Sequence, residues 1–197
     1  MIGKKIEQRK DEKMNITIIN GIQDSKENSF QNELELTVDK LNIEHTVDLF
    51  TVVDMDINYC CGCFGCWVKT PGRCIFNDEM IKVYKSMVKT DYLLFISPLV
   101  KGFISSDAKR AMDRIIPILL PYIDFFDGES HHVPRYEKRS KLGIVLIGED
   151  DMDVKAVEIV YDTFDRFSKN YHALNTFKAT AKSQALMEVL CNEISNC

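Results

Sequence analysis

Short runs of apolar residues alternate along this chain with longer stretches in which apolar residues recur every three or four positions. The short runs contain many β-branched residues and end at Gly, Pro or polar residues, which is typical of β-strands. The third run is continuous in apolar residues and is stopped by Pro98. The strands predicted in this way span residues 15–19, 45–50, 91–97, 142–147 and 174–178.

The stretches between these strands predict amphipathic helices. The second helix is expected to begin at residues 77–79, because acidic side chains there favour a first helical turn. The other predicted helices cover residues 30–41, 104 to about 120, 153–168 and 181–194. Apolar strands separated by helices imply a doubly wound α/β domain, in which helices cover both faces of a parallel sheet.

A parallel sheet of this kind binds ligands at the carboxyl ends of its strands, near the point where the strand order reverses. We therefore expect the chemistry in the loops that follow Ile19, Phe50, Ser97 and Ile147. The loop after Phe50 is the longest of them and contains most of the cysteines of the chain.

Length, hydrophobic content and net charge limit the classes of protein to which this chain can belong. The chain has 197 residues, of which 45% are hydrophobic, so it can bury a substantial core. We expect one domain over residues 14–197, preceded by a charged and solvated arm over residues 1–13. The net charge of −5 argues against nucleic-acid binding, which needs a basic face. The apolar runs are too short to span a membrane.

The cysteines carry the clearest chemical signal. Three of them follow one another at three-residue steps, and a fourth comes after a Thr-Pro-Gly turn, which gives the spacing C-x2-C-x2-C-x7-C. Thiols spaced in this way can converge on one centre, and four soft ligands suit an iron-sulfur cluster or zinc. The predicted metal ligands are Cys60, Cys63, Cys66 and Cys74, whereas Cys61 lies outside the spacing.

Other interpretations of the cysteines stay open at this point. Cysteine also packs well as a small apolar residue, and in a secreted protein a cluster of cysteines is a disulfide framework. The chain begins with a charged segment that lacks the apolar core of a signal peptide, so we expect a cytoplasmic protein with free thiols. Closely spaced cysteines in that compartment favour a metal-binding or redox role.

The sequence resembles the flavodoxin-like NAD(P)H-dependent FMN reductase family, and within it the iron-sulfur flavoproteins. The resemblance is specific over about residues 58–116 and rests on the cysteine spacing, the Gly-Cys-Phe-Gly-Cys-Trp core at 62–67, the segment 69–80, Ser97-Pro98 and residues 109–114. It implies a three-layer α/β/α sandwich with a five-stranded parallel sheet of order 2-1-3-4-5. It further implies FMN and NAD(P)H as cofactors, together with an iron-sulfur cluster held by the four cysteines.

The resemblance also implies which residues hold the flavin. The FMN phosphate would lie on the loop after the first strand, at Gly21, Ser25, Asn28 and Ser29. The ring would lie against the segment after the third strand, at Pro98, Leu99, Val100, Lys101, Gly102 and Phe103. Asp24 and Glu27 bring negative charge to the phosphate loop, so we expect FMN to bind weakly. The cysteine loop and residues 98–103 are expected to border one pocket.

Three functions follow from these features. The first is an FMN-dependent NAD(P)H oxidoreductase that passes electrons to an acceptor through the cysteine-bound cluster. The second is a flavin or quinone reductase without a cluster, and the third is a non-enzymatic metal-binding protein that has lost FMN. We also expect a homodimer or homotetramer, because the segment from Ile115 to Phe126 is more apolar than a single surface helix needs.

Overall fold

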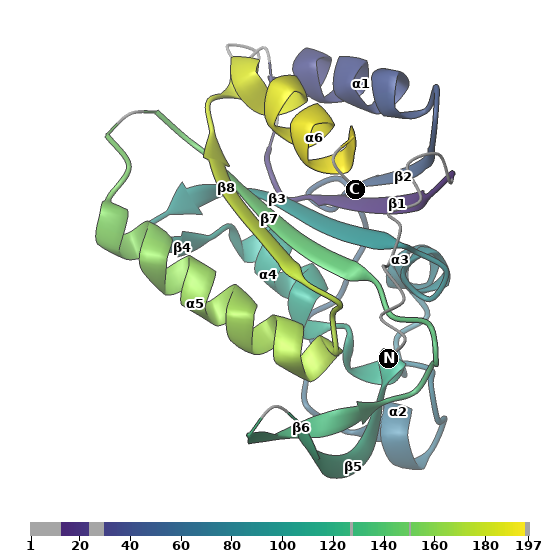
Figure 1. Cartoon of the computed structure of the whole chain (residues 1–197). Helices are drawn as coiled ribbons and strands as arrows, with labels where there is room; N and C mark the ends of the chain where they lie inside the picture. Colours follow the sequence, from purple (N-terminus) through teal and green to yellow (C-terminus); the bar gives the residue numbers. More distant parts are fainter. Residues whose placement is uncertain (1–12, 24–29, 127, 150, 196–197) are drawn as a thin grey trace, which may run out of the picture.

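Five parallel strands form the central sheet, in the order β2-β1-β3-β7-β8 (Figure 1). The structure is a computed structural model that describes residues 13–23, 30–126, 128–149 and 151–195. Counted along the parallel strands, this order is 2-1-3-4-5, so the predicted flavodoxin-like fold is confirmed. The strands are β1 (Asn15–Asn20), β2 (Thr46–Thr51), β3 (Tyr92–Val100), β7 (Lys141–Ile147) and β8 (Thr176–Ala181).

Helices cover both faces of the sheet and produce the three layers seen in Figure 1. One face packs against α1 (Phe30–Leu41) and α6 (Leu186–Ser195). The other face packs against α3 (Met80–Met87), α4 (Ser106–Asp113) and α5 (Val154–Tyr171). Of the predicted charged arm, residues 1–12 lie outside the described part of the chain.

Alternation along the strands divides the core in two. In β3, Leu93 and Phe95 point into the cluster that contains α3, α4 and α5, whereas Tyr92 and Leu94 point into the cluster that contains α1 and α6. All four side chains are buried, because successive strand residues face opposite sides of a sheet that is covered on both. This explains why the central strands are continuous apolar runs.

The third strand is longer than the sequence predicted. Pro98 does not end β3, which continues to Val100 and turns back into the short antiparallel β4 (Phe103–Ile104). Pro98 pairs with Ile147 of β7, whereas the last pair between β1 and β3 is Asn20 with Ile96. The missing N–H of Pro98 therefore costs no hydrogen bond to β1, since β1 has already ended.

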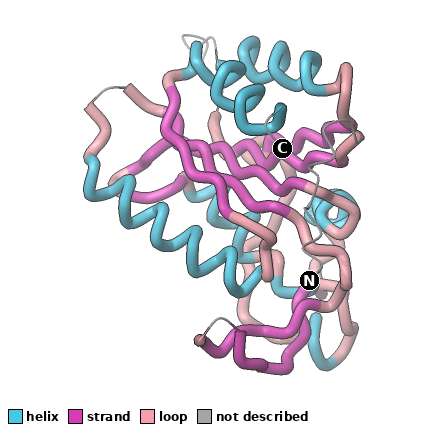
Figure 2. The backbone as a smooth tube through the Cα atoms, viewed as in Figure 1, coloured by secondary structure: helices cyan, strands magenta, loops and turns pink. Residues whose placement is uncertain are grey.

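The helix expected over residues 104–120 is also shorter than predicted. It ends at Asp113, and a 3-10 turn (Ile116–Ile118) leads into a two-stranded antiparallel hairpin, β5 (Leu119–Phe126) and β6 (Glu129–Pro134). Figure 2 shows this hairpin apart from the main sheet. The segment we expected as a helix at a subunit interface therefore has another structure, with Ile115 and Ile118 buried inside this chain.

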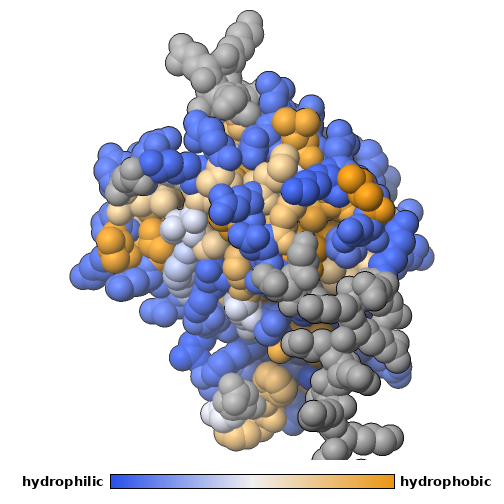
Figure 3. All heavy atoms as spheres, turned by 45° about the horizontal axis from the view of Figure 1, so that its top comes forward, coloured by the Kyte–Doolittle hydropathy of each residue, from blue (hydrophilic) through white to orange (hydrophobic). Residues whose placement is uncertain are grey.

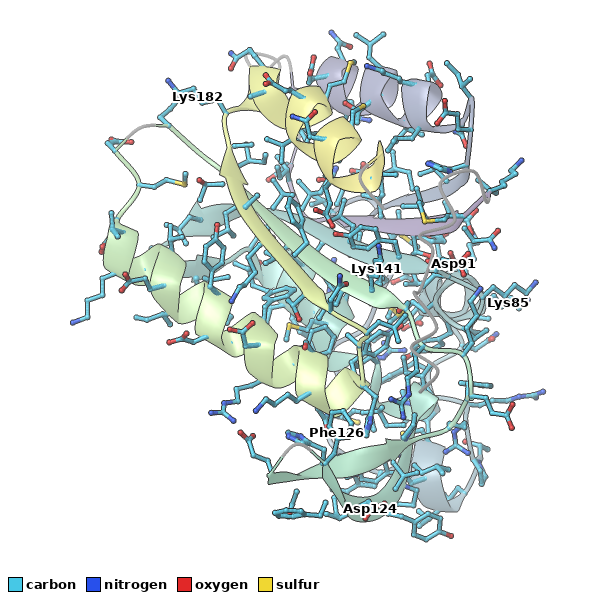
Figure 4. The ribbon with its side chains drawn as sticks, viewed as in Figure 1. Lys85, Asp91, Asp124, Phe126, Lys141 and Lys182 are labelled. Carbon is cyan, nitrogen blue, oxygen red and sulfur yellow. The ribbon has the colours of Figure 1, made fainter. Side chains whose placement is uncertain are left out.

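The hairpin is attached to the C-terminal end of α5. The Phe126 ring lies 4.6 Å from the His172 ring, and the His132 N–H donates to the Asn170 side chain at 3.1 Å. Lys169 forms an ion pair with Glu129 at 2.8 Å. In Figure 4 Phe126 lies between the hairpin and α5, whereas Asp124 lies on the far side of the hairpin. These contacts fix a hairpin that shares no strand with the main sheet.

The surface on the side of α1 and α6 is predominantly hydrophilic, with hydrophobic residues in separate groups (Figure 3). Among the described residues, no helix is both long and apolar enough to cross a bilayer.

Candidate functional site

The ends of β1 and β3 are tied together at the point where the strand order reverses. The Gly21 N–H donates to the Ile96 carbonyl at 2.8 Å. The Ser105 hydroxyl donates to the Gly21 carbonyl at 2.7 Å, and the Ser105 N–H donates to the Ser97 hydroxyl at 2.8 Å. Ser105 also caps α4, because its Oγ accepts from the Ala108 N–H at 3.2 Å. One serine thus joins both strand ends to the start of α4.

Gly21 is closely packed between these elements. A Cβ at this position would lie 2.6 Å from the Ala108 Cβ and 2.7 Å from the Ser105 Oγ, so the backbone can approach α4 only because no side chain is present. Both backbone polar groups of Gly21 are bonded within the protein. Of the other residues predicted for the phosphate, Ser25, Asn28 and Ser29 lie outside the described residues.

The residues predicted for the flavin ring form the β3–β4 hairpin. Lys101 and Gly102 have φ of 50° and 85°, and these two residues connect the paired Val100 and Phe103. Positive φ at both positions is the signature of a type I′ turn, which matches the twist of the strands it joins. Leu99 and Phe103 pack against the core beneath α5, whereas Val100 is 47% exposed. Of residues 98–103, Val100 and Lys101 are the exposed ones.

The loop after β2 carries the cysteines away from this edge of the sheet. Arg110 of α4 donates to the Val52 carbonyl at 2.9 Å, and Arg114 donates to the Asn58 carbonyl at 2.6 Å. The Arg110 guanidinium also lies over the Tyr59 ring, 5.6 Å from its centroid. These two arginines hold the loop against α4, from the middle of the helix to its C-terminal end.

The four predicted ligands line one cavity at that end of α4. The cavity has a volume of about 20 Å³, which is room for one water molecule. Cys60 and Cys63 are exposed at its mouth, Cys66 is buried and Cys74 is half-buried. Cys61 lines the same cavity although it breaks the spacing. Other walls are Phe64, Phe76, Arg114, Ile116 and Pro117. All four predicted ligands therefore line one cavity, and their role as metal ligands stays a prediction.

The thiols differ in acidity. Burial raises the pKa of the Cys66 thiol, and the nearby thiols of Cys74, Cys63 and Cys60 raise it further because thiolates repel one another. The pKa of Cys63 is lowered chiefly by the Gly65 N–H, which donates to its Sγ at 3.4 Å. The exposed Cys63 thus becomes a thiolate more readily than the buried Cys66.

The residues around this cavity can be compared with the needs of a metal ion and of a cluster. Among the described residues, no three His, Cys, Asp or Glu side chains are grouped closely enough to hold one ion. Zinc needs four thiolates at about 2.3 Å from one centre, whereas the thiolates of a cluster bind different irons. The donor chemistry fits an iron-sulfur cluster. The cavity of about 20 Å³ is smaller than such a cluster.

A buried ion pair lies next to the cysteine cavity, and one of its partners, Arg114, forms part of the cavity wall. The Arg114 guanidinium donates to both carboxylate oxygens of Asp78, at 2.8 and 3.1 Å, and its carbon lies 5.2 Å from the centre of the Phe76 ring. Burial alone would raise the pKa of Asp78, but hydrogen bonds from Arg114 and Asn58 outweigh it and lower the pKa to about 2. Asp78 is therefore a carboxylate at neutral pH, and Arg114 is a cation beside the cysteines.

Trp67 fixes the short helix α2 (Gly65–Val68) of the cysteine segment. Its indole N–H is shared between the carbonyls of Ile116 and Leu119, at 3.3 and 3.0 Å. The indole ring lies 4.8 Å from the His132 ring of β6 and 5.2 Å from the Phe64 ring. The cysteine segment is thereby held between the C-terminal end of α4 and the hairpin, and Figure 1 shows α2 beside the hairpin.

The prediction that the cysteine loop and residues 98–103 border one pocket is wrong. The cysteine cavity is lined by Arg114, Ile116 and Pro117, after the end of α4, and by no residue of 98–103. Residues 98–103 precede α4, whose eight residues span about 12 Å at 1.5 Å each. The two parts lie at opposite ends of this helix because Arg110 and Arg114 hold the intervening loop along it.

Sequence reasoning predicted neither the ion pair between Arg114 and Asp78 nor the hydrogen bonds of Trp67 to Ile116 and Leu119. Arg110 and Arg114 are four residues apart in a predicted helix, which places both on one face and could have indicated a shared partner. Asp78 was expected only as a helix start, and its Oδ1 does accept from the Met80 N–H at 3.2 Å. No sequence signal pairs Asp78 with Arg114, which lies 36 residues further along the chain.

Comparison with known proteins places the chain in a family. Two iron-sulfur flavoproteins of Methanocaldococcus jannaschii are 29% identical over 75 residues and 34% identical over 73 residues. These matches cover 38% and 37% of this chain, and only 38% and 36% of the two relatives.

Solved structures share the fold over nearly the whole chain. The NAD(P)H:quinone oxidoreductase from Methanothermobacter marburgensis has a TM-score of 0.61 at 15% identity and is covered to 94%, with 93% of this chain. An azoreductase from Bacillus anthracis has a TM-score of 0.58 at 11% identity, with 92% of each chain covered. The sequence profile of a family of oxidoreductases matches residues 14–127, which contain both ends of α4 and all four predicted ligands. The chain belongs to the NADPH-dependent FMN reductase family.

Proposed function

We propose that this protein is an NAD(P)H-dependent oxidoreductase that binds FMN at the carboxyl ends of β1 and β3. The observation that carries this proposal is the link from Gly21 through Ser105 to Ser97, which organises both strand ends at the point where the strand order reverses. This is where open α/β sheets bind their ligands. The family match covers the same segments.

In this proposal the residues of the first loop hold the phosphate and the β3–β4 hairpin lies against the ring. Ser25, Asn28 and Ser29 would bind the phosphate, Gly21 would let their loop start close against α4, and the exposed Val100 and Lys101 would face the ring. The Lys101 ammonium would favour the reduced, anionic form of the flavin, because a cation near that part of the ring stabilises its charge. Bound FMN accepts a hydride from a nicotinamide and releases electrons to an acceptor.

We further propose that Cys60, Cys63, Cys66 and Cys74 bind an iron-sulfur cluster. Their arrangement around one cavity, the buried cation of Arg114 and the names of the two methanogen relatives support this. A cluster supplies one-electron steps when it is bound. The small volume of the cavity favours the alternative, in which the protein is a flavin or quinone reductase with free thiols.

Substitution of Ser105 tests the flavin site. Ser105→Ala removes the hydroxyl that joins Gly21 to α4, and loss of this bond should weaken FMN binding several-fold and cost about 1 kcal/mol of stability. The matched control is Ser106→Ala, because Ser106 is exposed and adjacent in the same helix. Flavin fluorescence titration gives the dissociation constant, and loss of absorbance at 340 nm follows NADPH oxidation. A protein that oxidises no NADPH with saturating FMN would refute the proposed activity.

A further inference from the structure

A second cavity lies behind the cysteine cavity and shares two wall residues with it. Its volume is about 440 Å³, and the shared residues are Cys74 and Phe76. This falls in the range of roughly 300–1,000 Å³ that is typical of small-molecule sites. The remaining walls come from the cysteine segment, from α3 and the residue after it, and from the residues on either side of the hairpin. They are Gly72, Arg73, Asn77, Ile81, Tyr84, Lys85, Val88, Ile118 and Tyr136.

The charges around this cavity have one sign. Arg73 and Lys85 line it, and neither forms an ion pair within the described part of the chain. The cavity has no Asp or Glu in its wall. Two acidic residues that follow the wall residue Asn77 are already paired, Asp78 with Arg114 and Glu79 with Lys82. Lys85 is exposed, and Figure 4 shows its side chain extending outward from α3. The cavity therefore attracts an anion.

The walls between the two cations are apolar and aromatic. Tyr84 presents its ring, because its hydroxyl is already donated to the Arg114 carbonyl. Phe76 and Tyr136 add two more rings, and Ile81 of α3 and Val88, the residue after α3, add aliphatic surface. Rings of this kind favour a flat aromatic guest through stacked or edge contacts.

We propose that this cavity binds a small planar aromatic molecule that carries a carboxylate or sulfonate. Its rings would lie among Phe76, Tyr84 and Tyr136, and its anionic group would lie between Arg73 and Lys85. Cys74 is common to both cavities, so a guest here would lie against the cysteine-bound group. A role for the guest as electron acceptor rests on the proposed function, whereas its binding does not.

Isothermal titration of the full chain with naphthalene-2-sulfonate tests the binding. This probe is flat, anionic and not reduced by NAD(P)H, so its affinity does not depend on flavin content or activity. Lys85→Glu and Arg73→Glu should each weaken binding about tenfold, because an attraction is replaced by a repulsion at a partly exposed rim. The control Lys89→Glu changes the net charge equally at an exposed residue that does not line the cavity, and should leave the affinity within twofold.

A neutral analogue and a filled cavity complete the test. Naphthalene-2-methanol should bind at least fivefold more weakly than the sulfonate. Val88→Trp places a large side chain in the cavity and should abolish binding, with circular dichroism confirming the fold. Equal affinities in Lys85→Glu and Lys89→Glu, or unchanged binding in a folded Val88→Trp variant, would overturn the proposal. If Val88→Trp fails to fold, the affinities of Lys85→Glu and Arg73→Glu for the sulfonate decide whether the proposal holds. An inactive protein that still binds the probe refutes the proposed function alone.

Discussion

Arg114 and Asp78 form a two-point ion pair whose side chains are only 1% and 2% exposed. The pair connects the residue after α4 with the start of α3, and the same guanidinium donates to the Asn58 carbonyl, two residues before Cys60. Taking both charges out of water is expensive, so the pair persists because each partner satisfies the other. The position of the cysteine segment depends on it.

Removal of the charge of Asp78 should destabilise the protein strongly. Asp78→Asn leaves the Arg114 guanidinium buried without a counter-charge, which typically costs about 3–5 kcal/mol. Asp113→Asn is the matched control, because Asp113 pairs with Lys109 on the surface, where loss of an ion pair costs about 0–1 kcal/mol. Urea denaturation measures both. A loss below about 1 kcal/mol in Asp78→Asn would contradict the buried pair.

The same carboxylate should make stability depend on pH in the acid range. The pKa of Asp78 lies at about 2 in the folded protein, below its ordinary value of 3.8. A lowered pKa stabilises the fold above the ordinary value, and this contribution is lost as the pH falls from about 4 to about 2. The difference in unfolding free energy between wild type and Asp78→Asn should therefore shrink over this interval. A constant difference from pH 5 to pH 2 would contradict the assignment.

Single cysteine substitutions should distinguish the cysteines that bind a cluster from Cys61, which only lies beside them. In protein purified without oxygen, Cys63→Ser should abolish bound iron and acid-labile sulfide together, because a cluster needs its full set of thiolates. Cys61→Ser should retain both, since Cys61 lies outside the ligand spacing although it lines the cavity. Iron and sulfide analysis gives the result. Wild-type protein that is folded and active without either element would exclude the cluster and favour a reductase with free thiols.

Gly21 should not tolerate a side chain. In Gly21→Ala the new methyl group would lie within 2.7 Å of both Ala108 Cβ and Ser105 Oγ, and such overpacking costs about 1–3 kcal/mol. The displaced backbone should also weaken FMN binding. Gly128→Ala is the control, because it strains a turn with φ of 79° where no atom lies within 4 Å. It should lose some stability and no flavin affinity. Equal flavin binding in both variants would contradict our placement of the phosphate site.

The sequence predicted the central sheet because burial on both faces leaves continuous apolar strands such as 91–97 and 142–147. The prediction failed after residue 113, where the start of an apolar run, up to about residue 120, was assigned to a helix. Pro121 argues against a helix interior, and the Asp127-Gly128 pair is a hairpin signal that stands between the paired residues Phe126 and Glu129. These local signals could have revealed the hairpin.

The candidate site was predictable only where spacing is local. The four cysteines lie within fifteen residues, so their convergence on one cavity could be predicted from the sequence. Their distance from residues 98–103 could not, because it depends on hydrogen bonds from Arg110 and Arg114 to carbonyls more than fifty residues away. Backbone acceptors of this kind leave no trace in side-chain identity.

Trp67 is the only tryptophan of the chain, and it lies one residue after the buried Cys66, with its N–H bonded to two carbonyls. The intrinsic indole emission of the whole protein therefore originates beside the cysteines. Release of this segment would transfer the indole from a partly buried, hydrogen-bonded position to water and shift its emission to longer wavelength. The chain thus contains a built-in optical probe of its own cysteine segment, which reports docking of that segment without any added dye.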